Sequence, residues 1–160
     1  DMNTTGVIVA CKNDKAHNDI AAQLAVHSIT RKYYCIVHNR FKEEEGTVDA
    51  PIGRNPKDRK MMAVDRKNGK RAVTHYRVLE NFDKYSFIEC QLETGRTHQI
   101  RVHFSHIGYP LAGDSLYGGS AEFIRYQALH CGVLTFKDPM SGEYVRVESE
   151  LREDMKKLIL

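Results

Sequence analysis

This chain of 160 residues contains no long apolar run and no closely spaced pair of cysteines. A membrane-spanning helix needs ~20 consecutive apolar residues, and no run approaches that length, so we expect no membrane partner. Residues 1–6 lack the basic stretch followed by an apolar one that marks a secretory signal peptide. We therefore expect a cytoplasmic protein.

The cysteines are far apart in the sequence, and no two of them form a Cys-x-x-Cys pair. They are Cys11, Cys35, Cys90 and Cys131, each in an apolar, strand-like segment. This spacing does not fit a zinc site or a disulfide framework. We expect small buried hydrophobic residues in a reducing compartment.

Length and composition are those of one globular domain. The chain is 41% hydrophobic and 28% charged, and a domain of 160 residues is large enough to bury a core. The formal net charge of +3 permits a nucleic-acid partner without requiring one.

The hydrophobic pattern predicts strands with helices interspersed among them. We expect strands at 6–11, 31–37, 72–80, 85–92, 129–137 and 143–147, and helices at 15–26, 97–107 and 151–160. Residues 40–72 combine proline and glycine with dense positive charge, which predicts a long surface hairpin or loop. The order of elements favours an α+β fold, with a mixed, mainly antiparallel sheet and flanking helices.

The densest group of polar side chains lies where the strand at 85–92 meets the helix at 97–107. This segment reads Glu93-Thr94-Gly95-Arg96-Thr97-His98-Gln99-Ile100-Arg101-Val102-His103. Backbone N–H groups at the start of a helix can hold an anion together with cationic side chains. Buried polar donors are costly unless a polar or anionic group meets them. The segment therefore indicates a site for an anion or a carboxylate.

Two other interpretations of this segment stay open on the residues alone. The arginines can have a purely structural role. Alternatively, His98, His103 and His106 can bind a metal ion, which would make the chain a metal-dependent hydrolase. Their spacings of five and three residues do not match the i, i+4 histidine pair of a helical metal site. His103 also falls near the apolar stripe of the helix, where a core histidine is the commoner case.

Several motifs resemble the RluA-type pseudouridine synthases, which isomerise uridine in ribosomal or transfer RNA. The segment at 93–103 and Gly113-Asp114-Ser115-Leu116-Tyr117-Gly118 resemble the family signature, and Ala50-Pro51-Ile52-Gly53-Arg54 and Ala72-Val73-Thr74-His75-Tyr76 resemble its middle segment. The middle segment is most similar to the branch that acts on large-subunit ribosomal RNA. The resemblance implies the pseudouridine synthase catalytic-domain fold and a reaction that needs no cofactor or metal.

The resemblance also gives the first residue a role. The family motif reads Arg-Leu-Asp, two variable residues, then Thr/Ser-Thr/Ser-Gly, and residues 1–6 match it from the aspartate onward. Asp1 thus aligns with the catalytic aspartate, although from composition alone it is an unremarkable exposed residue. We expect residues 1–160 to be one catalytic domain, truncated at its N-terminus and without an S4-type RNA-binding domain. The alternative is a catalytically silent fragment that only binds RNA.

Two further catalytic candidates follow from the resemblance. Residues 29–37 resemble the strand that carries an active-site tyrosine, and the spacing puts this tyrosine at Tyr33. Tyr34 would then face the opposite side of the strand, while a tyrosine that merely packs in the core is the blander alternative for Tyr33. Arg101 aligns with the basic residue that pairs with the catalytic carboxylate, so it would keep Asp1 charged and oriented.

RNA phosphates are expected to meet the basic stretch at 54–71 and the turn before the helix at 97–107. The RNA-binding candidates are Arg54, Arg59, Lys60, Arg96 and His98. A merely solvated basic loop is the alternative for the stretch at 54–71. We expect ribosomal RNA as the partner, with transfer RNA as the second possibility, and a monomeric protein.

Overall fold

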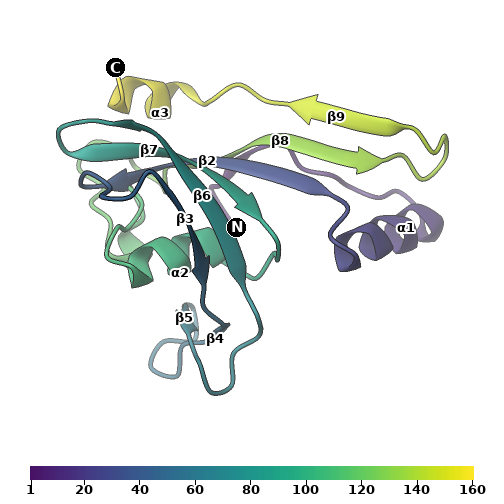
Figure 1. Ribbon diagram of the computed structural model, residues 1–160, viewed down its shortest axis with the longest axis horizontal. Helices are drawn as coiled ribbons and strands as arrows, with labels where there is room; N and C mark the ends of the chain where they lie inside the picture. Colours follow the sequence, from purple (N-terminus) through teal and green to yellow (C-terminus); the bar gives the residue numbers. More distant parts are fainter.

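A computed structural model describes residues 1–160, and a seven-stranded sheet runs through it (Figure 1). Its strands are β1 (Thr5–Gly6), β2 (Thr30–His38), β3 (Glu45–Asp49), β6 (Val73–Asn81), β7 (Tyr85–Leu92), β8 (Leu129–Lys137) and β9 (Tyr144–Glu148). The order is β1-β8-β2-β7-β6-β3, and β9 also pairs with β8. Every pairing is antiparallel except that of β1 with β8. The mixed, mainly antiparallel sheet of an α+β fold is confirmed.

Helices flank the sheet on both faces. They are α1 (Asp14–Ala25), α2 (Gln99–His106), α3 (Glu153–Leu158) and the short 3₁₀ helix η1 (Ser115–Tyr117). Successive side chains of a strand point to opposite faces. Cys35 therefore packs in the same cluster as Phe104 of α2, whereas Ile36 packs with Met155 of α3. Figure 1 shows α1 standing apart from the other helices, near one end of the sheet. No helix has the length and apolar character to cross a membrane.

Most of the expected elements form close to their predicted bounds, but the buried strand predicted at 6–11 is wrong. Only Thr5–Gly6 pairs with β8, and Ile8 is 89% exposed. The reason is non-local: β9 pairs with β8 from Val133 onward, so the next stretch of that edge is already occupied. Cys11 lies beyond the pairing and is only partly buried, while the other cysteines are buried and all are free thiols.

Helix α2 is fixed by an aromatic cluster on its apolar side. Phe104 is fully buried, and its ring meets those of Phe41 and Tyr76 edge-on, with centroids 5.9 and 5.7 Å away. The helix ends at His106, one residue before its predicted end, and Gly108 at φ +88° follows. This packing sets the position of the α2 N-terminus against the sheet.

His103 is a core residue of α2, as its place near the apolar stripe suggested. It is fully buried, and its Nε2 donates to the carbonyl of Ala50 at 2.8 Å. Its Nδ1 is therefore the acceptor for the hydroxyl of Thr74, also at 2.8 Å. Both ring nitrogens have partners within the core, so His103 has a structural role.

Residues 51–71, called the basic arm below, project from the main sheet as a small hairpin (Figure 1). Its strands are β4 (Ile52–Arg54) and β5 (Met62–Val64). The apolar side of the arm packs on Val102 of α2 and on Tyr117. Its exposed cations are Arg54, Lys57, Arg59, Lys60, Arg66, Lys67, Lys70 and Arg71. The predicted surface hairpin is confirmed for residues 51–71, but its predicted start at residue 40 is wrong, because β3 pairs with β6 in the main sheet.

Phe104→Ala should lower the free energy of unfolding by about 3–5 kcal/mol, because truncation leaves a cavity that the cluster cannot refill. Urea denaturation measures this loss. Phe123→Ala is the matched control, since Phe123 is 64% exposed, and it should change stability by less than about 0.5 kcal/mol. Equal losses for the two variants would contradict the packing described here.

Candidate active site

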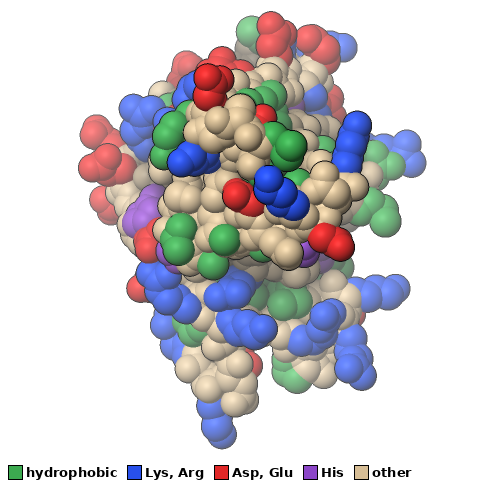
Figure 2. Space-filling model, turned by 90° about the vertical axis from the view of Figure 1, so that its right-hand side faces the viewer, with side chains coloured by type: hydrophobic (Ala, Val, Ile, Leu, Met, Phe, Trp, Pro, Cys, Tyr) green, Lys and Arg blue, Asp and Glu red, His purple; other side chains and the backbone are tan.

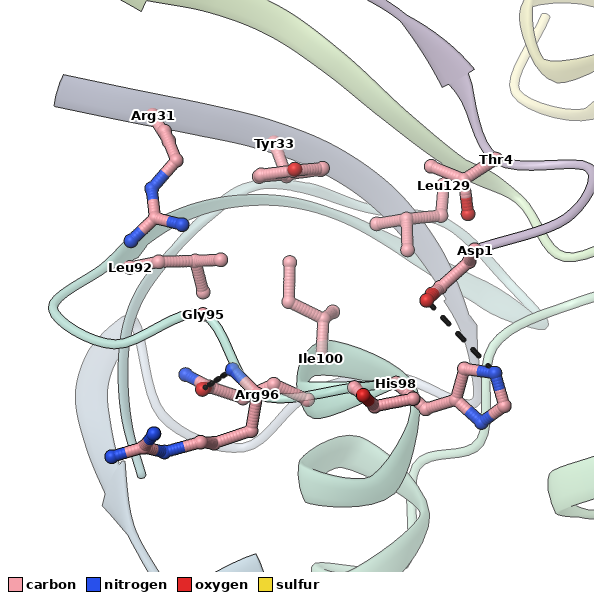
Figure 3. Close-up of a pocket in the computed structure, with 12 residues that line it drawn as sticks. Asp1, Thr4, Arg31, Tyr33, Leu92, Gly95, Arg96, His98, Ile100 and Leu129 are labelled. Carbon is pink, nitrogen blue, oxygen red and sulfur yellow. Dashed lines mark hydrogen bonds and ion pairs between the residues drawn. The ribbon is translucent and has the colours of Figure 1, made fainter. Parts of the chain in front are cut away.

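A cavity of about 420 Å³ lies at the turn that connects β7 to α2 (Figure 3). Its walls come from the start of the chain, from β2, from the turn before α2 and from α2 itself. The lining residues are Asp1, Thr4, Arg31, Tyr33, Leu92, Gly95, Arg96, Thr97, His98, Gln99, Ile100 and Leu129. Residues far apart in the sequence, including Asp1, Tyr33 and His98, therefore meet around one space.

Asp1 reaches this cavity because the chain start is paired with β8. Thr5 and Gly6 lie in parallel register with His130 and Cys131, and the Thr5 hydroxyl contacts His130 Nδ1 at 2.7 Å. Gly6 has φ +107°, and a Cβ there would lie 2.1 Å from the Cys131 carbonyl oxygen. Only glycine allows this approach, so the two-residue strand places Asp1 at the cavity.

The turn between Asp1 and β1 is fixed by side chains from the far end of the chain. Buried Gln127 donates from Nε2 to the carbonyl of Met2 at 2.6 Å. Arg152 donates to the carbonyl of Asn3 at 3.3 Å, and Asn3 itself has φ +70°. These hydrogen bonds to the main-chain carbonyls of Met2 and Asn3 fix the turn that carries the candidate carboxylate of Asp1.

Arg101 is buried, with 6% of the residue exposed, and its main partner is Asp114. Its Nε and Nη2 donate to the two carboxylate oxygens of Asp114 at 2.8 and 2.9 Å. Its remaining nitrogen, Nη1, lies 3.9 Å from Asp1 Oδ2. The expected contact with Asp1 is present at ion-pair distance, while the shorter, hydrogen-bonded contacts of Arg101 are those with Asp114.

Asp114 is the residue that sequence reasoning missed. It lies in the motif at 113–118 and reads as an ordinary turn residue between two glycines. The only signal for Asp114 is a physical one. If the guanidinium of Arg101 is buried against the protein, it needs a buried carboxylate as its counter-ion. The side of α2 opposite its apolar stripe therefore faces η1, where Ser105 also donates to the Tyr117 carbonyl at 2.8 Å.

His98 lies at the N-terminal end of α2 in a left-handed conformation, with φ 57°. Its Nε2 is 3.9 Å from Asp1 Oδ1, and its Nδ1 is 2.7 Å from the Tyr117 hydroxyl (Figure 3 shows the Asp1 contact). Burial, followed by the nearby charge of Arg101, lowers the pKa of His98. The ring is therefore neutral at neutral pH. Non-glycine residues in this conformation gather at functional sites.

Tyr33 lines the cavity from β2, while Tyr34 points to the other face and packs against Phe87, as predicted. The pairing of β2 with β8 shifts register between Lys32 and Tyr33. Such bulges redirect side chains and often lie beside active sites. Burial is the main cause that raises the pKa of Tyr33, so its phenol is protonated at neutral pH.

Arg31 is a second residue that sequence reasoning missed. It lines the cavity two positions before Tyr33, on the same side of β2. Its Nε is buried without a hydrogen-bond partner, and no acidic side chain pairs with it. The loop at Gly95 packs so closely that a Cβ there would lie 2.4 Å from Arg31 Nη1. Arg31 is therefore an unpaired cation at the cavity wall.

The RNA-binding candidates fall into two groups. Arg96 and His98 line the cavity, and Arg96 also braces the arm, because its Nε donates to the Arg71 carbonyl at 2.8 Å. Arg54, Arg59 and Lys60 lie outside the cavity on the arm, where the lower part of Figure 2 shows basic side chains gathered. No group of three His, Cys, Asp or Glu side chains is arranged to hold a metal ion.

An open cavity with a carboxylate, a tyrosine and arginines, beside an arm of mostly unpaired cations, is an enzyme-like site suited to a polyanion. Residues 1–106 match the model of the family "RNA pseudouridylate synthase". The chain therefore belongs to the RNA pseudouridylate synthase family, which confirms the resemblance to the RluA-type enzymes.

Individual relatives agree with the family match. The chain is 52% identical over 160 residues to the uncharacterized RNA pseudouridine synthase YlyB of Bacillus subtilis, covering 99% of this chain and 52% of the relative. It is 45% identical over 168 residues to the ribosomal large subunit pseudouridine synthase D of Zymomonas mobilis, covering 99% and 53%. The chain spans about half the length of the curated relatives it matches.

A solved structure has the same fold. The structure of human RNA pseudouridylate synthase domain containing 1 superposes with a TM-score of 0.74 at 25% identity. The superposition covers 92% of this chain and 71% of the human one. The sheet and helices described above are therefore those of a pseudouridylate synthase domain.

Gly95→Ala should weaken RNA binding several-fold while leaving stability within about 1 kcal/mol of the original. The added Cβ displaces the flexible guanidinium of Arg31 from the cavity wall rather than any main-chain atom. Filter binding with a large-subunit ribosomal RNA transcript measures the affinity, and urea denaturation measures stability.

Arg31→Gln provides the control for this mechanism. It should give a similar loss of affinity, and adding Gly95→Ala to it should cause little further loss, because both changes remove the same cation. Unchanged affinity in Gly95→Ala would show that Arg31 is not part of the binding surface.

Proposed function

We propose that this chain is the catalytic domain of an enzyme that converts uridine to pseudouridine in RNA, with large-subunit ribosomal RNA as the substrate. The observation that carries the proposal is that Asp1 and Tyr33 line one polar cavity, with Arg101 behind Asp1 at 3.9 Å. The ribosomal substrate is supported by similarity to relatives named ribosomal large subunit pseudouridine synthase D, from Zymomonas mobilis and Pseudomonas aeruginosa.

The reaction is an isomerisation, in which the uracil base is detached from the ribose and attached again through another atom. The N1–C1′ bond of uridine breaks, the uracil rotates, and a C5–C1′ bond forms. The proton on C5 is lost and N1 gains one, so atoms and electrons balance without an oxidant. The target base must first leave its stack, at a cost of a few kcal/mol that is smallest in loops.

Asp1 is the group that acts on the ribose in this proposal, either on C1′ as a nucleophile or on the 2′ hydrogen. It is the carboxylate at the cavity, and its side chain is only 19% exposed. Arg101 orients it through the Nη1 group that Asp114 leaves free. Because Asp114 takes the other guanidinium bonds, Arg101 cannot swing away from the carboxylate. Such pre-orientation is a large part of what an active site supplies.

Tyr33 provides a surface for the extruded uracil. Its ring lies at the cavity wall across from the α2 N-terminus (Figure 3). Because burial raises the pKa of Tyr33, its phenol is a poor base at neutral pH. Packing against the base is therefore its main role, in preference to removal of the C5 proton.

The arm and the cavity cations bind the RNA backbone in this proposal. Of the exposed cations on the arm, only Arg71 forms an ion pair, with Glu93. The others are free to displace counter-ions from phosphates. We expect the enzyme to act in the cytoplasm, where ribosomal RNA of its bacterial relatives is made.

Asp1→Asn in the full-length protein should abolish turnover while keeping RNA affinity within a few-fold, because the amide keeps the shape but not the charge. The assay is tritium release from RNA labelled at uridine C5. Asp83→Asn, at an exposed loop position, is the control and should retain full activity. Retained turnover in Asp1→Asn would remove the catalytic assignment.

Removing two arm charges, as Arg59→Gln with Lys60→Gln, should weaken RNA binding and make its dependence on salt shallower. Each lost phosphate contact lowers the slope of log K against log salt by about 1. The charge-matched control is Lys12→Gln with Lys15→Gln, two exposed lysines just before and within α1, neither of which lines the cavity. If both pairs of changes alter the slope equally, the arm is only a solvated basic surface.

A further inference from the structure

Tyr117 joins the basic arm to the candidate active site. Its hydroxyl is 2.9 Å from the main-chain nitrogen of Met62 in β5, and 2.7 Å from Nδ1 of His98. The guanidinium of Arg101 lies over its ring, 5.0 Å from the centroid. The ring itself is buried in the cluster that packs the arm onto α2. One side chain therefore contacts the arm, the helix N-terminus and the buried arginine.

The direction of the hydrogen bonds around this hydroxyl follows from the donors available. A main-chain N–H can only donate, so the Tyr117 oxygen accepts from Met62. The hydroxyl proton then has one polar partner at bonding distance, Nδ1 of His98. Nδ1 is thus the acceptor, and the neutral ring carries its hydrogen on Nε2. Burial and the charge of Arg101 lower the pKa of His98, which keeps the ring in this neutral form.

The protonated nitrogen of His98 faces the candidate carboxylate. Nε2 lies 3.9 Å from Asp1 Oδ1, and Nη1 of Arg101 lies 3.9 Å from Asp1 Oδ2. A movement of about 1 Å converts either contact into a hydrogen bond. Each of the two donors is fixed from behind by a different partner, Arg101 by Asp114 and His98 by Tyr117.

The backbone at His98 supports a role for this arrangement. Its left-handed conformation is unfavourable for a residue with a side chain, and it persists only where the surroundings hold it. No side-chain hydrogen bond caps the helix at this position. The bond from Tyr117 is therefore the polar contact that holds the ring of His98 in place.

We propose that Tyr117 is a positioning residue, which sets the protonated nitrogen of His98 and through it orients the Asp1 carboxylate. The proposal rests on the function proposed above. Because the Met62 N–H donates to the Tyr117 hydroxyl, two hydrogen bonds link the arm to His98, and the 3.9 Å contact of His98 with Asp1 completes the path to the carboxylate. In this proposal, RNA bound on the arm therefore also influences the Asp1 carboxylate through these contacts.

Tyr117→Phe tests the proposal, because it removes the hydroxyl and keeps the ring. In the full-length protein, with a large-subunit ribosomal RNA transcript labelled at uridine C5, kcat should fall about tenfold or more while KM stays within twofold. Tyr144→Phe, at a position 74% exposed on β9, is the matched control and should leave both constants unchanged. An unchanged kcat in Tyr117→Phe would overturn the proposal.

A double-variant cycle asks whether Tyr117 acts through His98. His98→Asn removes Nε2–H with a residue that tolerates the left-handed backbone. It should give a loss of kcat similar to that of Tyr117→Phe, and the double variant should lose little more. Losses that multiply in the double variant would show independent roles and overturn the relay from Tyr117 to His98.

The tautomer of His98 can be read without any turnover, from ¹⁵N imidazole spectra of the full-length protein. In the unsubstituted protein, the His98 ring should carry its hydrogen on Nε2. In Tyr117→Phe, the ring should lose its preference for this tautomer. Hydrogen on Nδ1 in the original protein would overturn the proposal, even if Tyr117→Phe folded poorly. If the unsubstituted full-length protein released no tritium from the labelled RNA, the proposed function would fail while the tautomer result stood, so the two failures are distinguishable.

Discussion

The buried ion pair between Arg101 and Asp114 is the interaction on which the site depends. The Asp114 side chain is 1% exposed, and both of its oxygens are bonded to the guanidinium. Loss of either partner leaves an uncompensated buried charge, which costs about 3–5 kcal/mol in comparable cases. The pair ties α2 to the segment that carries η1. It thereby fixes Tyr117 beside His98 and leaves one guanidinium nitrogen free to face Asp1.

The two parts of the site differ in how firmly they are held: Tyr33 and α2 belong to the packed core, whereas Asp1 is held by few contacts. Tyr33 and the N-terminus of α2 belong to the central strands and the helix packed on them, where the largest buried cluster lies. Asp1, by contrast, is held by a two-residue strand and by Gln127. Both carboxylate oxygens face donors at 3.9 Å, without yet bonding to them. The site is therefore set to tighten around a ligand while its walls stay in place.

The features that could be predicted from the sequence were local secondary structure and residues that belong to recognisable motifs. The hydrophobic pattern predicted the strand at 85–92 with the bounds that β7 has, and the resemblance to a family grouped Asp1, Tyr33 and Arg101. What the sequence could not predict depended on distant neighbours. The apolar run at 6–11 has the pattern of a buried strand, yet β9 occupies the edge that it would need. Likewise, spacing alone does not reveal that Arg101 bonds mainly to Asp114, or that Arg31 remains unpaired.

The pairing of Thr5 with His130 spans 125 positions, and this has a consequence for the newly made chain. Contacts so distant in sequence form late in folding, and β8 leaves the ribosome long after the start of the chain. The basic arm closes by local pairing of β4 with β5. In a growing chain, the basic arm can thus form well before the carboxylate of Asp1 is placed at the cavity. The order of synthesis therefore separates closure of the basic arm from placement of Asp1 at the cavity, which requires nearly the whole domain.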